Sequence, residues 1–277
     1  MTASKISSFS RIHPDAIIGA NVEIEDFAKI DKDVVIGDGC WIGANAIIYP
    51  GTRMGKSCKV FPGAVIAAEP QDLKYNGEYS MVYIGDHTTI REYVTINRGT
   101  SSKGITRIGN HSLLMAYCHI GHDSVLGDHC VLANNVQVAG EVFIEDWAVI
   151  GGMSAVHQFC RIGTHAMVSG MTGVVSDVAP YTKVFGLPAK YMGINVIGLK
   201  RRGFTKEQIN NIQDIYRVLF QQGLNTSQAL EFIRFNLVPS DEKERILNFV
   251  KKSGRGIIKS MPDEIHPQEI LQHFEQT

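Results

Sequence analysis

Three histidines in two short segments are the side chains of this sequence best suited to acid–base chemistry. His119 and His122 belong to the segment HIGHD, where Asp123 directly follows the second histidine, and His157 belongs to AVHQF. An imidazole backed by a carboxylate can act as a general base near neutral pH. Neutral imidazoles are also common ligands of zinc and iron, so these residues leave a metal site open as the alternative.

A six-residue repeat determines which elements position these histidines. From Ile12 to Val174, every sixth residue is aliphatic except at Asp72, Glu78 and Ser102. Neither an α-helix nor a single β-strand has this period, whereas a parallel β-helix of hexapeptide repeats turns one large side chain of each short strand inward. The repeat therefore predicts a triangular prism in which three hexads, or 18 residues, form one coil, with coils stacked at about 4.8 Å.

A second, smaller interior position follows each large aliphatic residue by four places. All five cysteines fall in it: Cys40, Cys58, Cys118, Cys130 and Cys160. Their spacing is inherited from the repeat, which favours packing over a disulfide or a metal site. Glycine often comes directly after the large aliphatic residue, as at Gly37 and Gly85, and we expect it where the chain turns without room for a Cβ atom.

The length of one coil predicts which residues stack on His122. Gly140 and Gln158 follow it at intervals of 18 residues, so the three should share one face of successive coils, with His157 beside Gln158. The glycine offers a backbone N–H with no side chain, which is a possible donor to a developing oxyanion. Acyl transfer to a hydroxyl group needs both a base and such a donor.

The repeat is interrupted twice, at residues 71–82 and 101–106, and each interruption is a multiple of six residues long. We therefore predict two loops that project from an intact prism. The first carries a polar cluster of Gln71, Asp72, Lys74 and Tyr75. Loops on a rigid scaffold often contact ligands, although a solvated connector would also explain this composition.

The sequence divides into a β-helical part, residues 1–194, and an α-helical part, residues 195–277. The hexads fade after Val184, and helical spacing begins near Phe204. Capping residues and glycines define the expected helices. We expect a first helix that begins with a capping box of Thr205 and Gln208 and ends at Gly223, and a second helix that begins at Thr226 or Ser227. A third helix, DEKERILNFVKKSG, should end at Gly254, and a last helix should begin near Pro267.

Composition limits the partners of the chain. The 277 residues carry a net charge of −1 and are 44% hydrophobic, which provides no strong field for nucleic acid. The segment MTASKISSFSR lacks the apolar region of a signal peptide, and no stretch approaches the roughly 20 apolar residues of a membrane span. We therefore expect a cytoplasmic protein without a membrane span or a nucleic-acid partner.

Several sequence blocks resemble the UDP-N-acetylglucosamine acyltransferase family, whose members catalyse the first step of lipid A biosynthesis. The blocks are QDLKY, HSLLM, HIGHD, LANN, IGGMSAVHQFC and GLKRRGF, and the similarity runs from about residue 11 through Gly203 and more weakly beyond. VHQFC and GLKRRGF are specific to this family among hexapeptide acyltransferases. The resemblance implies a left-handed parallel β-helix, a homotrimer with active sites between neighbouring prisms, and no metal or other cofactor.

The resemblance also implies a reaction and residue roles. A (3R)-3-hydroxyacyl chain would pass from acyl carrier protein to the glucosamine 3-hydroxyl of UDP-N-acetylglucosamine. His122 would be the general base, Asp123 would fix its tautomer, and the Gly140 amide would stabilise the oxyanion. The implied substrate contacts are Gln71, Asp72 and Lys74 from the neighbouring subunit for the sugar and the acyl hydroxyl, His119, His157 and Gln158 for the sugar and diphosphate, and Asn195, Arg201 and Arg202 for the nucleotide.

Four further positions bear on substrate choice. Asn97 and Glu141 stand where histidine is usual in the family, and Ile197 stands where a glutamate contacts the nucleotide. Gly170 aligns with the position that limits acyl length, where a glycine leaves the pocket open. We expect a chain of about 14 carbons or more, because an unfilled pocket accepts extra methylenes.

Three other functions remain open. An N-acyltransferase of the same pathway should carry an amino-terminal uridine-binding domain, whereas the hexads here begin near residue 11. A trimeric scaffold without catalysis would make His122 dispensable. A metalloenzyme would hold zinc or iron, although the i, i+3 spacing of His119 and His122 puts them on different parts of one turn.

Overall fold

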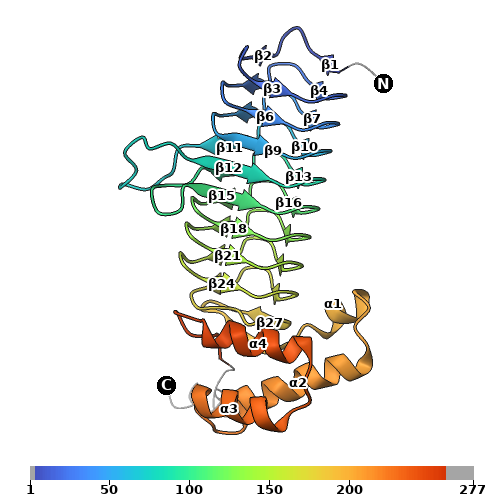
Figure 1. The fold of residues 1–277 in the computed structure, drawn as a ribbon, viewed down its shortest axis with the longest axis vertical. Helices are drawn as coiled ribbons and strands as arrows, with labels where there is room; N and C mark the ends of the chain where they lie inside the picture. Colours follow the sequence, from blue (N-terminus) through green and yellow to red (C-terminus); the bar gives the residue numbers. More distant parts are fainter. Residues whose placement is uncertain (1–3, 260–277) are drawn as a thin grey trace, which may run out of the picture.

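The computed structural model describes residues 4–259. A tall prism of stacked coils occupies most of it, and a group of helices lies at the carboxy-terminal end of the prism (Figure 1). The prism has three faces, which we call A, B and C, and each face is one sheet. The chain visits the faces in turn, so that one coil contributes one short strand to each.

The strands have the following bounds. Face A contains β1 (Lys5–Ile6), β4 (Glu23–Ile24), β7 (Trp41–Ile42), β10 (Lys59–Val60), β13 (Thr89–Ile90), β16 (Leu113–Leu114), β19 (Val131–Leu132), β22 (Val149–Ile150), β25 (Met167–Val168), β27 (Thr182–Phe185) and β28 (Lys190–Ile194). Face B contains β2 (Arg11–Ile12), β5 (Lys29–Ile30), β8 (Ile47–Ile48), β11 (Val65–Ala68), β14 (Thr95–Asn97), β17 (His119–Ile120), β20 (Gln137–Val138), β23 (Ala155–Val156) and β26 (Gly173–Val174). Face C contains β3 (Ile17–Ile18), β6 (Val35–Ile36), β9 (Thr52–Met54), β12 (Met81–Ile84), β15 (Ile105–Ile108), β18 (Val125–Leu126), β21 (Phe143–Ile144) and β24 (Arg161–Ile162).

Strand register confirms the predicted coil length. In face A, Ile24 pairs with Ile42, one coil further along the chain, in parallel register. Across the two interruptions, Met54 pairs with Ile84 and Ile84 pairs with Ile108. These separations exceed one coil by twelve and six residues, so the inserted segments leave the phase of the prism unchanged.

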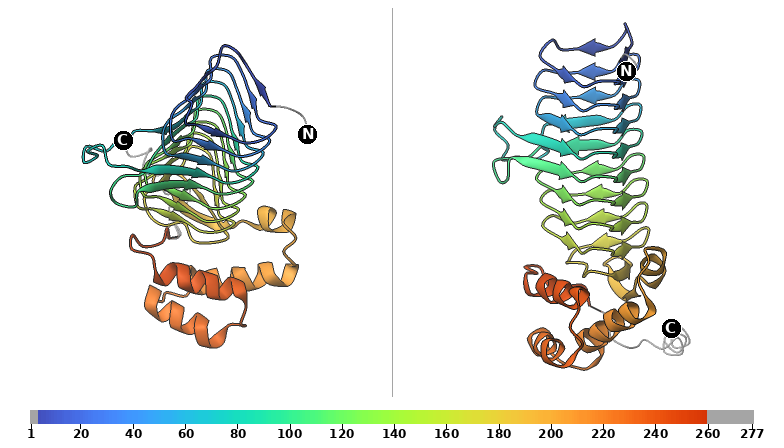
Figure 2. Two further views of the ribbon diagram at one scale, coloured as in Figure 1. Left: turned by 45° about the horizontal axis from the view of Figure 1, so that its top comes forward. Right: turned by 45° about the vertical axis from the view of Figure 1, so that its right-hand side comes forward.

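The two loops lie slightly earlier in the chain than predicted. They run over residues 69–80, between β11 and β12, and over residues 98–104, between β14 and β15. The predicted bounds, 71–82 and 101–106, are wrong because Met81 and Val82 pair with Ile105 and Thr106 in an extension of face C. Both loops project from the same side of the prism (Figure 2).

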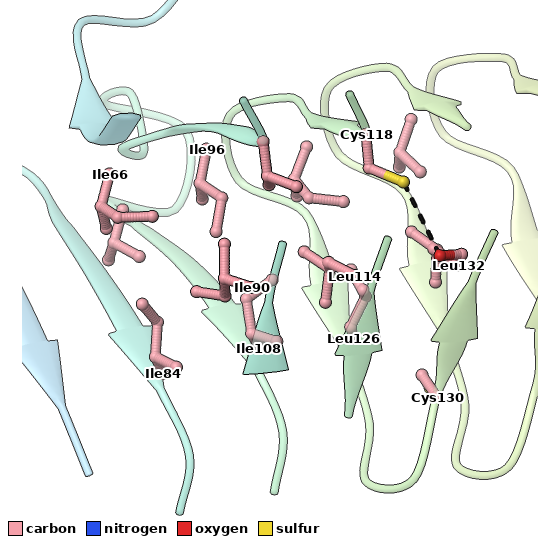
Figure 3. Close-up of a cluster of buried hydrophobic side chains, with 14 of the residues drawn as sticks. Ile66, Ile84, Ile90, Ile96, Ile108, Leu114, Cys118, Leu126, Cys130 and Leu132 are labelled. Atoms are coloured by element: carbon pink, nitrogen blue, oxygen red, sulfur yellow. Dashed lines mark hydrogen bonds between the residues drawn. The ribbon is translucent and has the colours of Figure 1, made fainter. Parts of the chain in front are cut away.

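The large aliphatic residues of the repeat form the core of the prism. Ile66, Ile90, Ile96 and Leu114 have no exposed surface, and Figure 3 shows these side chains between the strands. The five cysteines are free thiols, all buried in the smaller interior positions. Their predicted role in packing is confirmed.

At each corner of the prism, the glycine and the residue with a left-handed backbone conformation occupy different positions. A Cβ atom on Gly37 would lie 2.5 Å from the carbonyl oxygen of Gly55 in the next coil, so the predicted absence of room is confirmed. The left-handed backbone conformation falls two residues later, and non-glycine residues adopt it, as at Phe27 (φ 60°) and Asn45 (φ 58°). Close approach of the coils, and not a positive φ, therefore explains glycine at this position.

The carboxy-terminal helices are α1 (Val196–Arg201), α2 (Lys206–Gln221), α3 (Thr226–Asn236) and α4 (Asp241–Lys251). The capping box of Thr205 and Gln208 is confirmed at the start of α2. Asn225 caps α3 and exchanges hydrogen bonds with Gln228, and α3 begins at Thr226, the first of the two predicted starting residues. The predicted helix near Pro267 lies outside the described residues.

The helices pack on the last coil of the prism. The side chains of Ala179 and Tyr181 share a buried cluster with apolar residues of α2, α3 and α4. The hydroxyl of Tyr216 in α2 donates to the carbonyl oxygen of Pro180 at 2.6 Å. In residues 4–259, none of the helices combines the length and apolar character needed to span a membrane.

Candidate active site

The HIGHD segment forms the corner where the chain passes from face B to face C. His119 belongs to β17, and His122 and Asp123 follow before β18 begins. Ile120 and Ser124 on either side are buried in the prism. The segment is therefore fixed at both ends, and it holds Asp123 in the left-handed conformation (φ 59°).

His122 and Asp123 form a buried pair. The imidazole Nδ1 lies 2.9 Å from Asp123 Oδ2, while His122 is 8% exposed and Asp123 is fully buried. When Nδ1–H donates to this carboxylate, Nε2 carries the lone pair and can accept a proton. The geometry therefore gives His122 the tautomer that a general base needs.

Gly140 leaves the space that the His122 ring occupies. A Cβ atom built on Gly140 would lie 2.4 Å from His122 Nε2 and 2.6 Å from Cε1. The prediction that these two residues stack in successive coils is confirmed. Only glycine brings the backbone of the next coil so close to His122 Nε2.

Asp72 faces His122 of its own chain. Its Oδ2 lies 3.7 Å from His122 Nε2, on the side of the ring opposite Asp123. The prediction that Asp72 reaches in from a neighbouring subunit is therefore wrong, because the 69–80 loop folds back beside its own prism. Gln71 and Lys74 lie on the same loop and are exposed.

Contacts with the 98–104 loop hold the 69–80 loop in place. The Arg98 guanidinium lies 5.5 Å from the Tyr75 ring, and its Nη2 donates to the Tyr75 hydroxyl at 2.7 Å. The backbone N–H of Ser101 donates to Glu78 Oε1 at 2.8 Å. The two loops therefore form one unit around the HIGHD corner.

His119 lies close to His122, in surroundings that favour its neutral ring. Its Nδ1 lies 2.8 Å from the hydroxyl of Thr95 in the neighbouring strand. Burial lowers the pKa of His119, and the nearby His122 lowers it further. A neutral imidazole here can exchange a hydrogen bond with a ligand but adds no positive charge.

His157 and Gln158 continue the same corner two coils beyond His122. The register of face B, in which His119 pairs with Gln137 and Gln137 with Ala155, confirms this placement. His157 is exposed and Gln158 is half-buried. The histidine Nδ1 lies 3.0 Å from the Gln158 carbonyl oxygen, which orients the ring.

Asn195, Arg201 and Arg202 lie elsewhere on the prism. They line a groove of about 570 Å³ against face A, together with Lys183 and the apolar side chain of Met167. Asn195 caps α1, because its Oδ1 accepts the N–H of Gly198 at 3.2 Å. Within one chain, this basic groove and the HIGHD corner are separate sites.

His165 and Trp147, which the sequence analysis missed, hold the basic groove together. Arg202 Nη1 lies 3.3 Å from His165 Nδ1, and its guanidinium lies 5.4 Å from the Trp147 ring centroid. Burial, with Arg202 and Arg245 nearby, lowers the pKa of His165 to about 4, so its neutral ring can accept this hydrogen bond. The sequence signal for this pair is the interval of 18 residues, or one coil, between Trp147 and His165.

The remaining predicted residues occupy varied surroundings. Gly170 is exposed at the corner between faces A and B, where a Cβ atom would lie 3.2 Å from the Gly152 carbonyl oxygen. Asn97 is buried and donates to the Glu69 carbonyl oxygen at 2.8 Å. Glu141 lies 3.7 Å from the Lys103 ammonium, and Ile197 is 68% exposed beside the basic groove.

In residues 4–259, the structure brings no three histidine, cysteine, aspartate or glutamate side chains into an arrangement that could hold a metal ion. His119 and His122, considered above as zinc ligands, instead each pair with a different residue of the chain. His119 pairs with Thr95, and His122 pairs with Asp123.

Stacked hexapeptide coils with a buried histidine–aspartate pair define a hexapeptide-repeat transferase. The family described as bacterial transferase hexapeptide (six repeats) matches residues 33–68 and 105–140, and that described as Udp N-acetylglucosamine O-acyltransferase, Domain 2, matches residues 177–258. The chain belongs to the UDP-N-acetylglucosamine O-acyltransferase family, as its curated relatives and solved structures show.

Two curated relatives are named acyl-[acyl-carrier-protein]–UDP-N-acetylglucosamine O-acyltransferase. The protein from Anaeromyxobacter sp. (strain K) is 46% identical over 191 residues, which cover 69% of this chain and 74% of the relative. The protein from Pseudomonas entomophila (strain L48) is 39% identical over 257 residues, which cover 92% and 100% of the two chains.

The crystal structure of LpxA, a UDP-N-acetylglucosamine acyltransferase from Bacteroides fragilis 9343, is 49% identical and has a TM-score of 0.90, covering 91% of this chain and 99% of that chain. LpxA from Acinetobacter baumannii is 37% identical with a TM-score of 0.89, covering 91% and 99%. The predicted fold class, a left-handed parallel β-helix with a carboxy-terminal helical region, and the predicted acyltransferase activity are confirmed.

Proposed function

We propose that this chain transfers a (3R)-3-hydroxyacyl group from acyl carrier protein to the glucosamine 3-hydroxyl of UDP-N-acetylglucosamine, with His122 as the general base. One observation carries the proposal: the Nε2 of a buried, aspartate-paired histidine lies against the bare backbone of Gly140. The names of the relatives supply the two substrates.

The reaction follows from the two nitrogens of His122. Nε2 takes the proton of the sugar hydroxyl while that oxygen attacks the thioester carbonyl, and Asp123 stabilises the imidazolium that forms. The Gly140 amide stabilises the oxyanion of the tetrahedral intermediate. The carbon–sulfur bond then breaks, the imidazolium returns its proton to the departing thiolate, and the products are the 3-O-acyl sugar nucleotide and the free carrier thiol.

The charges near the two sites match the parts of the substrates. Asp72, 3.7 Å from Nε2, can accept a hydrogen bond from a substrate hydroxyl, and the exposed Gln71 and Lys74 lie on the same loop. His119, His157 and Gln158 line the corner on which the sugar would rest. Arg201 and Arg202 suit the diphosphate, because a guanidinium donates two parallel hydrogen bonds to phosphate oxygens.

The separation of the two sites supports a homotrimer. His122 lies at the corner between faces B and C, whereas the Arg202 groove lies against face A. Trp147, which contacts Arg202, follows Gly140 by seven residues in the same coil, so both sites lie at a similar height along the prism. A neighbouring prism packed side by side could therefore bring its basic groove to the His122 corner and complete one site.

The proposed reaction is the first step of lipid A biosynthesis, and we propose that this chain carries it out in the cytoplasm.

Gly170 and Met171 lie at the corner between faces A and B, and Met171 is 71% exposed. A neighbouring chain could close this corner into a channel for the acyl chain. The absence of a side chain at Gly170 supports the use of a long 3-hydroxyacyl group.

Steady-state kinetics of purified protein test the proposal. Wild type, His122→Ala and the control His111→Ala would be assayed with UDP-N-acetylglucosamine and a ladder of 3-hydroxyacyl carrier proteins, with a chelator present. We expect a loss of about 100-fold or more for His122→Ala, and near wild-type rates for His111→Ala, whose ring stacks on other histidines at a different corner. Undiminished transfer by His122→Ala would favour a different base, and activity only after metal is restored would favour a metalloenzyme.

A further inference from the structure

The 98–104 loop encloses the Asp123 carboxylate. The backbone N–H of Thr100 lies 3.0 Å from both Oδ1 and Oδ2, and the backbone N–H of Lys103 donates to Oδ1 at 3.2 Å. The Thr100 hydroxyl donates to Oδ2 at 2.6 Å. Because Asp123 has no exposed surface, these donors take the place of water around a buried carboxylate.

The direction of the Thr100 hydroxyl is set by a second hydrogen bond. Its oxygen accepts the backbone N–H of Ser102 at 3.2 Å, which leaves its proton for Asp123 Oδ2. The same Oδ2 lies 2.9 Å from His122 Nδ1. Thr100 therefore fixes the oxygen atom that orients the catalytic imidazole.

The loop is itself fastened at several points. The Lys103 ammonium donates to the Asp123 carbonyl oxygen at 3.3 Å and lies 3.7 Å from Glu141 Oε2 in the next coil. A Cβ atom on Gly99 would lie 2.1 Å from the backbone nitrogen of Ile105 and 2.8 Å from Asp123 Oδ1. Glycine thus allows the loop to pass directly over the carboxylate.

We infer that Thr100 is a positioning residue for acyl transfer, acting through Asp123 on the orientation of His122. The inference rests on the proposed function. Without the Thr100 hydroxyl, the carboxylate keeps its backbone donors but can rotate, so the imidazole points less often at the sugar hydroxyl. Small displacements of a base lower the rate of the chemical step strongly, while substrate binding on other surfaces is retained.

A double-mutant cycle tests this role. Thr100→Val, Thr100→Ser, Asp123→Ala and the double variant Thr100→Val/Asp123→Ala would be assayed for kcat and for KM of UDP-N-acetylglucosamine. We expect Thr100→Val to lower kcat about tenfold or more with KM changed less than about twofold, the size of losing a hydrogen bond to a charged group. Thr100→Ser should recover most of kcat, and Thr100→Val should have no further effect in the Asp123→Ala background.

Thr88→Val is the matched control, since Thr88 is another buried threonine whose hydroxyl donates to the Gly109 carbonyl oxygen away from His122. It should lower thermal stability without lowering kcat. If Thr100→Val does not fold, Thr100→Ala replaces it in the cycle. A kcat within twofold of wild type, or an equal loss in the Asp123→Ala background, would overturn the inference, whereas an inactive wild type would instead refute the proposed function.

Discussion

Gly140→Ala should disable the active site while leaving the fold intact. The added Cβ atom would lie 2.4 Å from His122 Nε2, 2.6 Å from Cε1 and 2.9 Å from Cδ2. Ordinary van der Waals contact begins near 3.4 Å, so the ring must move by about 1 Å. This movement strains the 2.9 Å hydrogen bond to Asp123, because the ring is held on its other side by that carboxylate.

A displacement of about 1 Å in a catalytic group costs on the order of 100-fold in rate. We therefore expect Gly140→Ala to lower kcat by about that factor, with a Tm close to that of wild type. Gly254→Ala is the control, since nothing lies within 4 Å of its added Cβ atom and its φ is ordinary. A kcat for Gly140→Ala within threefold of wild type would refute the argument that the ring position depends on this glycine.

Three further predictions concern pH, chain length and the core. Burial and the neighbouring Arg202 lower the pKa of His165 from 6.5 to about 4, so the unfolded chain binds more protons between these values and stability falls as pH decreases through that range. The Tm of His165→Gln should therefore fall less than that of wild type between pH 6.5 and pH 4, and parallel curves would contradict this reasoning. Gly170→Met should shift the preferred donor toward shorter acyl chains in competition assays analysed by mass spectrometry, and an unchanged preference would remove Gly170 from the acyl pocket. Ile120→Ala should lower the free energy of unfolding by about 3 kcal/mol in urea titrations, because Ile120 is fully buried. Leu73→Ala, at a fully exposed loop position, should change it by less than about 0.5 kcal/mol, and similar losses for both would contradict the assigned core.

The hexad period predicted those features of the molecule that depend on strand pairing. The stacking of Gly140 on His122 follows directly from the coil length, because each parallel strand pairs in register with the strand one coil away. The burial of the five cysteines follows for the same reason. A strict repeat fixes the side of the prism on which each side chain lies, so these positions needed no knowledge of tertiary contacts.

The path of the inserted loops could not be predicted in this way. Asp72 was expected to approach a neighbouring subunit, yet its loop is drawn toward its own HIGHD corner by ties such as that between Arg98 and Tyr75. Thr100 was overlooked because its role depends on a loop conformation that follows no period. His165 was overlooked because its partner, Arg202, is distant in sequence and meets it only where the helices pack on the prism.

Similar reasons account for the exact bounds of the elements. Both Thr226 and Ser227 were possible first residues of α3, and the hydrogen bonds between Asn225 and Gln228 select Thr226. The loop bounds shifted because Met81 and Ile105, which flank the two insertions, pair with each other. The loop bounds therefore depended on tertiary strand pairing, whereas the start of α3 depended on a local capping box.

Single-turnover kinetics would test the role of His122 most directly. Wild type and His122→Ala, each in excess over a 3-hydroxyacyl carrier protein, would be mixed with saturating UDP-N-acetylglucosamine, and nucleotide binding would be measured on the same samples by calorimetry. We predict equal nucleotide affinity and formation of the 3-O-acyl product slowed at least about 100-fold in His122→Ala. An unchanged rate of ester formation in His122→Ala would contradict the assignment of His122 as the general base.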